Sequence, residues 1–225
     1  ANIVHEFGRP LGALRVGMQA LTRGAKDDPE LRDELLSGMD MEMERLQYLL
    51  EELAHLHDQV LGTLELNLQP VNLSIWLPQV LIPWREAAKD KKQTWQITIP
   101  NDLPPILVDT QRLAQAVGNL VSNAIKYTPV GGSITLTTGS SQQETWIQVR
   151  DSGPGMSAEE QARIFEPFFR GGEKQRIKQG MGLGLSIAQN LVLAHNGRIE
   201  VKSAINRGSE FTIWLPKDLL TEPNT

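Results

Sequence analysis

Apolar residues recur every three or four positions through the first part of the chain. One stripe runs through residues 3–21, and a second, longer stripe runs through residues 31–60. This spacing collects apolar side chains on one side of an α-helix. Between the stripes, Asp28 is a suitable N-cap and Pro29 suits a first helical position. The pattern predicts a hairpin of two amphipathic helices, with helical character up to about residue 67.

A single hairpin cannot cover both apolar stripes well. Pairing with a second copy would bury them, so we expect a homodimer held by a four-helix bundle. The alternative, in which the hairpin packs on the downstream part of its own chain, stays open at this point.

The pattern changes after Gln69-Pro70, where helical and strand-like segments alternate. Helices are predicted at residues 73–91, 111–127, 158–164 and 183–195. Strands are predicted at residues 95–99, 133–138, 145–151, 198–202 and 210–215. This mixture predicts an α+β protein, with an α/β sandwich whose helices cover one face of a mixed, mainly antiparallel sheet. We expect a helical hairpin domain at 1–68, a second domain at 69–218 and a disordered tail at 219–225.

Composition narrows the possible functions. The 225 residues are 40% hydrophobic and 22% charged, which suits a soluble globular protein. A formal net charge of −5 argues against general nucleic-acid binding. The absence of cysteine excludes disulfides and cysteine nucleophiles, and it fits a reducing compartment. No apolar run reaches the roughly 20 residues of a membrane span. We therefore expect a cytoplasmic fragment, with any membrane anchor before Ala1.

Two asparagines lie one helical turn apart in the segment 111–127. Asn119 and Asn123 share a helix face, with Lys126 and Tyr127 just beyond. An amide oxygen suits Mg²⁺, which usually keeps several waters and shares substrate phosphates. Lys126 could neutralise phosphate charge and Tyr127 could cover a base. On its own, this spacing is more often a solvated polar face.

Two glycine-containing segments follow. Asp151-Ser152-Gly153-Pro154-Gly155 comes after a predicted strand, where a carboxylate could accept a hydrogen bond from adenine and glycines could pass close to a flat ring. A simple turn is equally compatible with it. Gly180-Met181-Gly182-Leu183-Gly184 precedes a predicted helix, and its amides could cradle phosphate. Between them, residues 171–179 are polar and basic and look like a lid, with possible phosphate contacts from Lys174, Arg176 and Lys178.

In this order, the segments resemble the sensor histidine kinases of two-component systems. The catalytic domain of that family belongs to the ATPase superfamily of Hsp90, gyrase B and MutL. His5-Glu6-Phe7 with Pro10-Leu11 resembles the family's phosphoacceptor segment, and Phe165 to Phe169 resembles its phenylalanine box. The resemblance covers nearly the whole chain.

The resemblance implies an ATP-dependent kinase that phosphorylates His5 and then an aspartate of a response regulator receiver domain. It implies that Glu6 acts as acid and base, that Asn123 holds Mg²⁺ and that Asp151 recognises adenine. The nucleotide contacts that it implies are Asn119, Asn123, Lys126, Tyr127, Asp151, Gly153, Gly155, Arg170, Gly180, Gly182, Gly184 and Leu185.

The histidine segment departs from the family pattern at Gly8 and Arg9, where the family usually has an arginine and then a threonine or asparagine. In the family, that small polar residue positions the water that dephosphorylates the regulator, so we expect weak phosphatase activity. Asn119 stands where hydrolytic relatives have a glutamate base, which favours a kinase. The alternatives are a nucleotide-gated scaffold that transfers nothing, or an ATPase of the chaperone or DNA-repair type.

Overall fold

The computed structural model describes residues 3–61, 65–171 and 182–217. Along the chain it divides into two compact units, with the boundary between Gly62 and Thr63. We call them the helical unit and the sheet unit, and each is described by itself. No helix among the described residues is long and apolar enough to cross a membrane.

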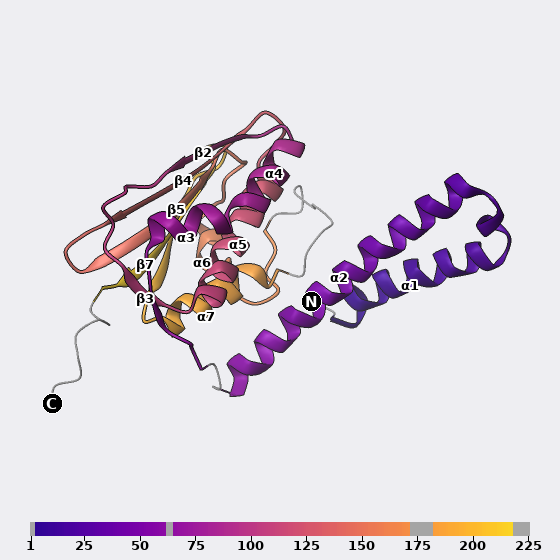
Figure 1. The fold of residues 1–225 in the computed structure, drawn as a ribbon, viewed down its shortest axis with the longest axis horizontal. Helices are drawn as coiled ribbons and strands as arrows, with labels where there is room; N and C mark the ends of the chain where they lie inside the picture. The colour runs from indigo at the N-terminus through magenta and orange to yellow at the C-terminus, as the bar shows by residue number, and fades with distance from the viewer. Residues whose placement is uncertain (1–2, 62–64, 172–181, 218–225) are drawn as a thin grey trace. The chain divides into compact units, whose positions relative to one another are not determined.

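The helical unit is a hairpin of two long helices (Figure 1). Its elements are α1 (Ile3–Thr22), the 3-10 turn η1 (Ala25–Asp27) and α2 (Pro29–Leu61). Asp28 Oδ1 accepts hydrogen bonds from the backbone amides of Glu30 and Leu31, at 3.1 and 3.2 Å. The prediction that Asp28 caps the second helix, which begins at Pro29, is confirmed. Helix α2 ends at Leu61, earlier than predicted, and residues 65–68 have no regular structure.

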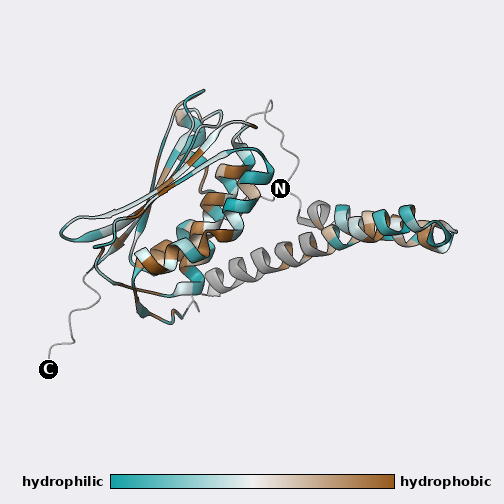
Figure 2. Ribbon diagram, turned by 45° about the horizontal axis from the view of Figure 1, so that its top comes forward, coloured by the Kyte–Doolittle hydropathy of each residue, from teal (hydrophilic) through white to brown (hydrophobic). Residues whose placement is uncertain are grey.

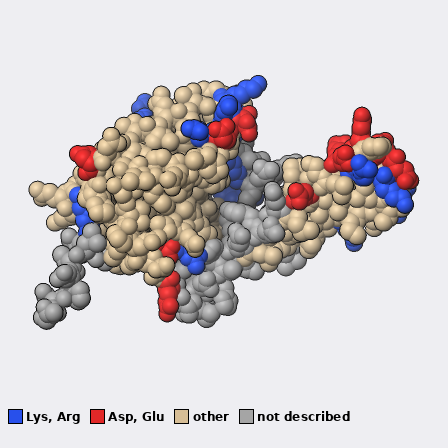
Figure 3. All heavy atoms as spheres, viewed as in Figure 1, with Lys and Arg blue, Asp and Glu red and all other residues tan. Residues whose placement is uncertain are grey.

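Apolar side chains of both long helices remain exposed. Leu11 and Met18 of α1 are 55% and 59% exposed, and Met43 and Leu50 of α2 are 51% and 57% exposed. Figure 2 shows the mixture of apolar and polar residues along the hairpin. Acidic and basic side chains gather at the hairpin turn (Figure 3). Among the side chains that the structure describes, the single hairpin therefore leaves apolar surface uncovered on both helices.

The sheet unit combines helices with strands in the order β1 (Gln69–Val71), α3 (Leu73–Val80), α4 (Ile82–Asp90), β2 (Thr94–Thr98), β3 (Ile106–Val108), α5 (Thr110–Tyr127), β4 (Ser133–Ser140), β5 (Glu144–Asp151), α6 (Ala158–Arg163), α7 (Gly184–Ala194), β6 (Arg198–Ser203) and β7 (Ser209–Pro216). The main sheet has the strand order β2-β4-β5-β7-β6. Strand β2 runs parallel to β4, and the other neighbours are antiparallel. The predicted mixed, mainly antiparallel sheet is confirmed.

The helices of this unit lie on one face of the sheet (Figures 1 and 2). Strands alternate buried and less buried residues, because successive side chains point to opposite faces. Leu136, Ile147 and Ile213 are fully buried on the helix-covered face. Helix α5 presents Val117 and Leu120, both fully buried. The core therefore lies between the sheet and α5, which fixes the helix that carries four of the predicted nucleotide contacts.

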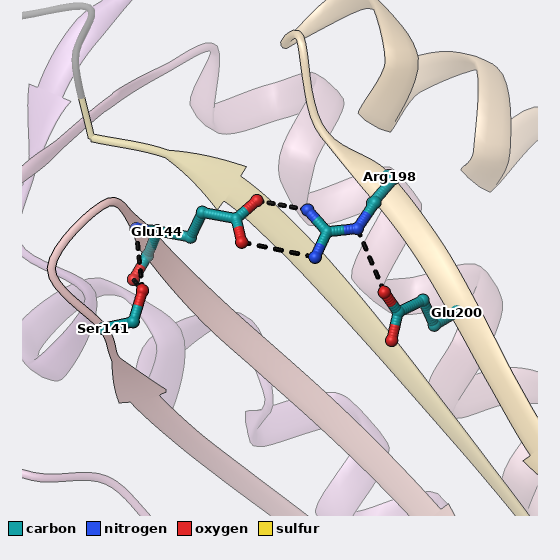
Figure 4. Close-up of polar contacts among 4 residues, drawn as sticks. All are labelled: Ser141, Glu144, Arg198 and Glu200. Carbon is teal, nitrogen blue, oxygen red and sulfur yellow. Dashed lines mark hydrogen bonds and ion pairs between the residues drawn. The ribbon is translucent and has the colours of Figure 1, made fainter.

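The other face of the sheet carries aromatic rings and an ion-pair network. Trp146 and Trp214 pair across β5 and β7, with ring centroids 6.4 Å apart. The Arg198 guanidinium lies 5.0 Å from the centroid of the Trp214 ring. It also bonds both carboxylate oxygens of Glu144 and one oxygen of Glu200 (Figure 4). These contacts link β5, β6 and β7 at the strand ends farthest from the site described below.

Two predictions about secondary structure were incomplete. The single helix predicted at residues 73–91 is two helices, α3 and α4, separated at Leu81. Pro83 lies in the first turn of α4, where a missing amide costs little, so the proline favours a new helix start. Strands β1 and β3 were missed. They pair antiparallel with one another, from Gln69 opposite Val108 to Val71 opposite Ile106, and each is too short for a recognisable alternation.

Candidate nucleotide-binding site

Helix α5 carries Asn119, Asn123, Lys126 and Tyr127. It begins where the Asp109 carboxylate accepts hydrogen bonds from the amides of residues 111 and 112, both at 3.0 Å. The apolar face of the helix is buried in the core, which leaves Asn119, Asn123 and Lys126 half-buried at its edge. The two asparagines therefore lie one turn apart on an accessible strip, as the spacing predicted.

Asp151 ends strand β5, with its side chain turned into the helix-covered layer. The residue is only 8% exposed, and Oδ1 accepts a hydrogen bond from the Gly153 amide at 2.7 Å. Burial raises the pKa of the Asp151 carboxyl, and hydrogen bonds from the Gly153 and Ser209 amides oppose that shift. A buried acceptor with spare lone pairs can receive a hydrogen bond from a ligand amino group.

The turn after Asp151 packs closely on the connection between β6 and β7. The Asn206 amide donates to the Pro154 carbonyl at 2.6 Å, and the Met156 amide donates to Ser203 Oγ at 2.9 Å. Gly155 has a φ of 67°, and a Cβ at this position would lie 1.9 Å from the Ala204 carbonyl oxygen. From the sequence, this glycine is explained by close approach to a ligand ring. Packing against the Ala204 carbonyl requires glycine here even without a ligand.

The same turn meets the end of α5. A Cβ on Gly153 would lie 3.2 Å from the Tyr127 carbonyl oxygen. Nearby, Ser152 Oγ accepts a hydrogen bond from the Ser133 amide at 2.8 Å, which fixes the start of β4 against the turn. The structure thus brings Tyr127 and Asp151 together, although they are 24 positions apart in the sequence.

Helix α7 brings a helix N-terminus to Asn119. Its first residue is Gly184, and a Cβ there would lie 3.6 Å from the Asn119 side-chain oxygen. Leu185 follows and is half-buried. Just before, Gly182 has a φ of 78°, and its carbonyl accepts a hydrogen bond from the Phe168 amide at 3.0 Å. The free amides and dipole of a helix N-terminus attract anions, so phosphate would be favoured beside Asn119.

Arg170 lies close enough to influence Tyr127. Burial raises the pKa of the Tyr127 hydroxyl, and the Arg170 charge opposes that shift. Next to it, the Phe169 ring stacks under the Arg163 guanidinium, 4.5 Å from the ring centroid. The Arg170 charge therefore acts on the end of α5, at the residue next to Phe169.

Some predicted site residues lie outside the described part of the structure. His5 and Glu6 lie in the first turns of α1, but their side chains are outside the described part. Gly180, Lys174, Arg176 and Lys178 fall within residues 172–181, which are also outside it.

The metal ligand predicted at this site is Asn123. Among the described residues, no group of three or more His, Asp or Glu could hold a metal ion. The half-buried Asn123 amide fits Mg²⁺ nonetheless, because this ion is usually bound through one or two protein oxygens plus water and substrate phosphates.

Sequence reasoning missed a buried connection at the other end of α5. The Asp109 amide donates to His195 Nε2 at 3.0 Å, and His195 Nδ1 bonds the Leu191 carbonyl at 2.7 Å. The Asp109 carboxylate also accepts from the Asn67 amide at 3.0 Å. This junction ties the start of α5 to the end of α7 and to the segment that follows the hairpin. The only sequence signal for it was an aspartate before a helix.

Comparison with known proteins agrees with this architecture. A family model described as "Histidine kinase-, DNA gyrase B-, and HSP90-like ATPase" matches residues 108–219. This range contains α5, the Asp151 turn and α7, so these elements of the sheet unit match an ATPase domain of that class.

The relatives extend the likeness to the hairpin. The chain is 33% identical over 229 residues to the sensor histidine kinase Hik2 of Thermosynechococcus vestitus, covering 99% of this chain and 59% of that protein. It is 31% identical over 222 residues to the adaptive-response sensory kinase SasA of Rippkaea orientalis, covering 96% of this chain and 56% of that protein. The chain therefore spans a little over half the length of these relatives.

Two solved structures have a similar fold. The Acinetobacter baumannii histidine kinase AdeS superposes with a TM-score of 0.75 at 25% identity, covering 95% of this chain and 98% of that one. Full-length ShkA in complex with AMPPNP superposes with a TM-score of 0.74 at 30% identity, covering 94% of this chain and 44% of that one. The chain belongs to the histidine kinases.

Proposed function

We propose that this chain is the core of an ATP-dependent protein-histidine kinase. ATP bound to the sheet unit phosphorylates His5, and the phosphoryl group then passes to an aspartate in the receiver domain of a response regulator. The observation that carries the proposal is that α5 meets the Asp151 turn at Tyr127 and the start of α7 at Asn119. The AMPPNP bound in the structure of ShkA supports an adenine nucleotide as the ligand.

The geometry indicates where the base and the phosphates of the nucleotide would lie in the site. The Asp151 carboxylate accepts a hydrogen bond from the adenine amino group, and Tyr127 lies beside the base. The phosphates lie toward Asn119 and the N-terminus of α7, where Lys126 and Arg170 can add positive charge. Asn123 would hold Mg²⁺ through its amide oxygen. When bound, the ion offsets charge on the phosphates.

The transfer step needs a nucleophile and a proton acceptor on the helical unit. A neutral imidazole nitrogen of His5 attacks the γ-phosphorus, a nitrogen–phosphorus bond forms, and the bond to the β-phosphate oxygen breaks to release ADP. Glu6 takes the imidazole proton. In the second step the nitrogen–phosphorus bond breaks, and a receiver aspartate oxygen takes the phosphoryl group. Use of ATP and the lack of cysteine both fit the cytoplasm as the place of action.

The hairpin is the proposed phosphotransfer and dimerisation domain, and the sheet unit is the catalytic domain. Exposed apolar residues such as Leu11, Met18 and Leu50 support a homodimer that buries them in a four-helix bundle. Arg9, four residues after His5, stands where the family has a small polar residue that positions the water for dephosphorylation of the regulator. We therefore propose that release of phosphate from the regulator is weak.

Labelling separates this function from its alternatives. The purified chain is incubated with γ-labelled ATP and Mg²⁺, and acid-labile phosphoryl groups on protein are counted. The expected result is labelling that His5→Gln and Asp151→Asn abolish and that His55→Gln, the matched control, retains. Release of free phosphate without protein labelling would indicate an ATPase. Nucleotide binding without either product would indicate a scaffold.

A further inference from the structure

The short turn between α4 and β2 holds the C-terminal end of α5. Lys91 Nζ donates to the carbonyl oxygens of Ile125 and Lys126, at 2.6 and 2.9 Å. Gln93 Nε2 donates to the carbonyls of Ile125 and Thr128, at 2.9 and 2.6 Å. Gln93 is only 7% exposed. Two side chains from one turn thus supply four hydrogen bonds to one helix end.

These bonds satisfy groups that a helix cannot satisfy itself. The last four carbonyls of an α-helix lack partners within the helix, and the C-terminus carries partial negative charge. At the end of α5, the Ala124 carbonyl accepts from the Thr128 amide at 3.0 Å. The carbonyls of Ile125 and Lys126 are taken by the Lys91 ammonium, whose positive charge suits a helix C-terminus.

The turn is itself fixed by the neighbouring backbone. The Gly131 amide donates to the Lys92 carbonyl at 3.0 Å, and the Thr94 amide donates to the Gly132 carbonyl at 2.8 Å. Lys92 adopts a φ of 56°, which turns the chain so that the residues on both sides reach α5. The loop after α5 and the turn before β2 therefore hold one another.

This helix end is the part of α5 that forms the base side of the site. Tyr127 is its last residue, and its carbonyl lies against Gly153 in the turn that follows Asp151. A shift of the helix end would change the distance between Tyr127 and Asp151. No side-chain atom of Lys91 or Gln93 is needed to touch the ligand for this effect.

We propose that Lys91 and Gln93 are positioning residues for nucleotide binding, which hold the end of α5 so that Tyr127 and Asp151 stay in register around the base. This inference rests on the proposed nucleotide site. It adds Lys91 and Gln93, two residues outside the motif segments, which lie on a turn that bonds the end of α5.

The test measures nucleotide affinity and turnover for Lys91→Met, Lys91→Arg and Gln93→Met. Lys89→Met is the matched control, because Lys89 is the neighbouring lysine of α4 and its side chain is 79% exposed. The dissociation constant of ADP is measured by calorimetry. KM for ATP and kcat for self-phosphorylation come from initial rates, at a temperature where melting curves show every variant folded.

We expect Lys91→Met and Gln93→Met to raise the ADP dissociation constant and KM about tenfold, because misplaced base contacts weaken binding of the ground state and the transition state alike. The value of kcat at saturating ATP should change less than about twofold, since the binding groups themselves remain. Lys91→Arg should restore affinity to within about twofold, because a guanidinium can donate to the same carbonyls. The Lys89 control should bind like the parent.

The outcomes distinguish this proposal from the proposed function. If Asp151→Asn binds ADP as tightly as the parent chain, the nucleotide site itself is wrong. If Asp151→Asn abolishes binding while Lys91→Met and Gln93→Met leave it unchanged, the site stands and the positioning role is refuted. Equal loss in kcat and affinity, without rescue by Lys91→Arg, would indicate general structural damage and would also refute it.

Discussion

Replacing Gly155 by alanine tests how the Asp151 turn is built. Gly155 and Gly131 both have left-handed backbone, with φ values of 67° and 80°. A Cβ on Gly155 would lie 1.9 Å from the Ala204 carbonyl oxygen, whereas a Cβ on Gly131 would meet no atom within 4 Å. Gly131→Ala is therefore a matched control that carries the backbone strain without the collision.

The expected magnitudes follow from these two contributions. A left-handed conformation costs a residue other than glycine about 1–2 kcal/mol. Forced overlap in a packed region adds about 1–3 kcal/mol. We therefore expect unfolding free energies to fall by about 1–2 kcal/mol in Gly131→Ala and by about 2–5 kcal/mol in Gly155→Ala. For a domain of this size, each kcal/mol lowers the melting temperature by about 2–4 °C.

Thermal unfolding followed by circular dichroism measures the two variants side by side, and ADP titration reports on the site. Gly155→Ala should also weaken ADP binding, because the turn must move away from Ala204 and carries Asp151 with it. Gly131→Ala should weaken ADP binding less than Gly155→Ala, because a Cβ there meets no neighbouring atom and need not break the bond from the residue 131 amide to the Lys92 carbonyl. Equal melting temperatures in the two variants would contradict the close packing described here, and normal ADP affinity in Gly155→Ala would separate the turn from the site.

Three further predictions concern stability, assembly and the return reaction. Burial raises the pKa of the Asp109 carboxyl. Hydrogen bonds from the backbone amides of residues 112, 67 and 111, together with the nearby Arg112 charge, outweigh burial and hold that pKa below the usual 3.8. Its stabilising effect is thus complete above pH 3.8 and lost as the pH falls through the lowered pKa. Asp109→Asn should destabilise the protein at pH 7 and flatten the acid part of a urea-unfolding profile; an unchanged profile would refute this. Leu11→Glu should shift a dimer toward monomer in sedimentation, whereas Leu193→Glu, at a similarly exposed position of the sheet unit (53%), should not; a dimer that survives Leu11→Glu would exclude the bundle interface. Arg9→Thr should speed release of phosphate from a phosphorylated regulator, and an unchanged rate would mean that Arg9 is not what limits it.

Local sequence patterns predicted most elements of the fold. The helical hairpin, its Asp28 cap and the five strands of the main sheet all follow from periodicities within a few residues. The division at Leu81 and the strand pair β1 and β3 did not follow, because short segments carry little periodic signal. The pairing of β1 with β3 depends on residues more than 30 positions apart.

The candidate site was likewise predicted only in part by local sequence patterns. Motif spacing brought out Asn119, Asn123 and Asp151, and the structure gathers them with Tyr127 and Gly184. The residues that hold those groups in place carried no motif. Gln93 is 32 and 35 positions from the carbonyls that it bonds.

The sequence by itself determined which residue types occur in which order and which face of each helix they share. Those properties depend on helix and strand geometry over one or two turns, so they can be read from neighbours in the chain. Tertiary structure decided what each glycine and each polar side chain meets. Gly155 needs to be glycine because of the Ala204 carbonyl, and Asp109 meets His195 from 86 positions away. Such contacts depend on how segments that are distant in the sequence pack together, and a pattern of neighbouring residues cannot predict that packing.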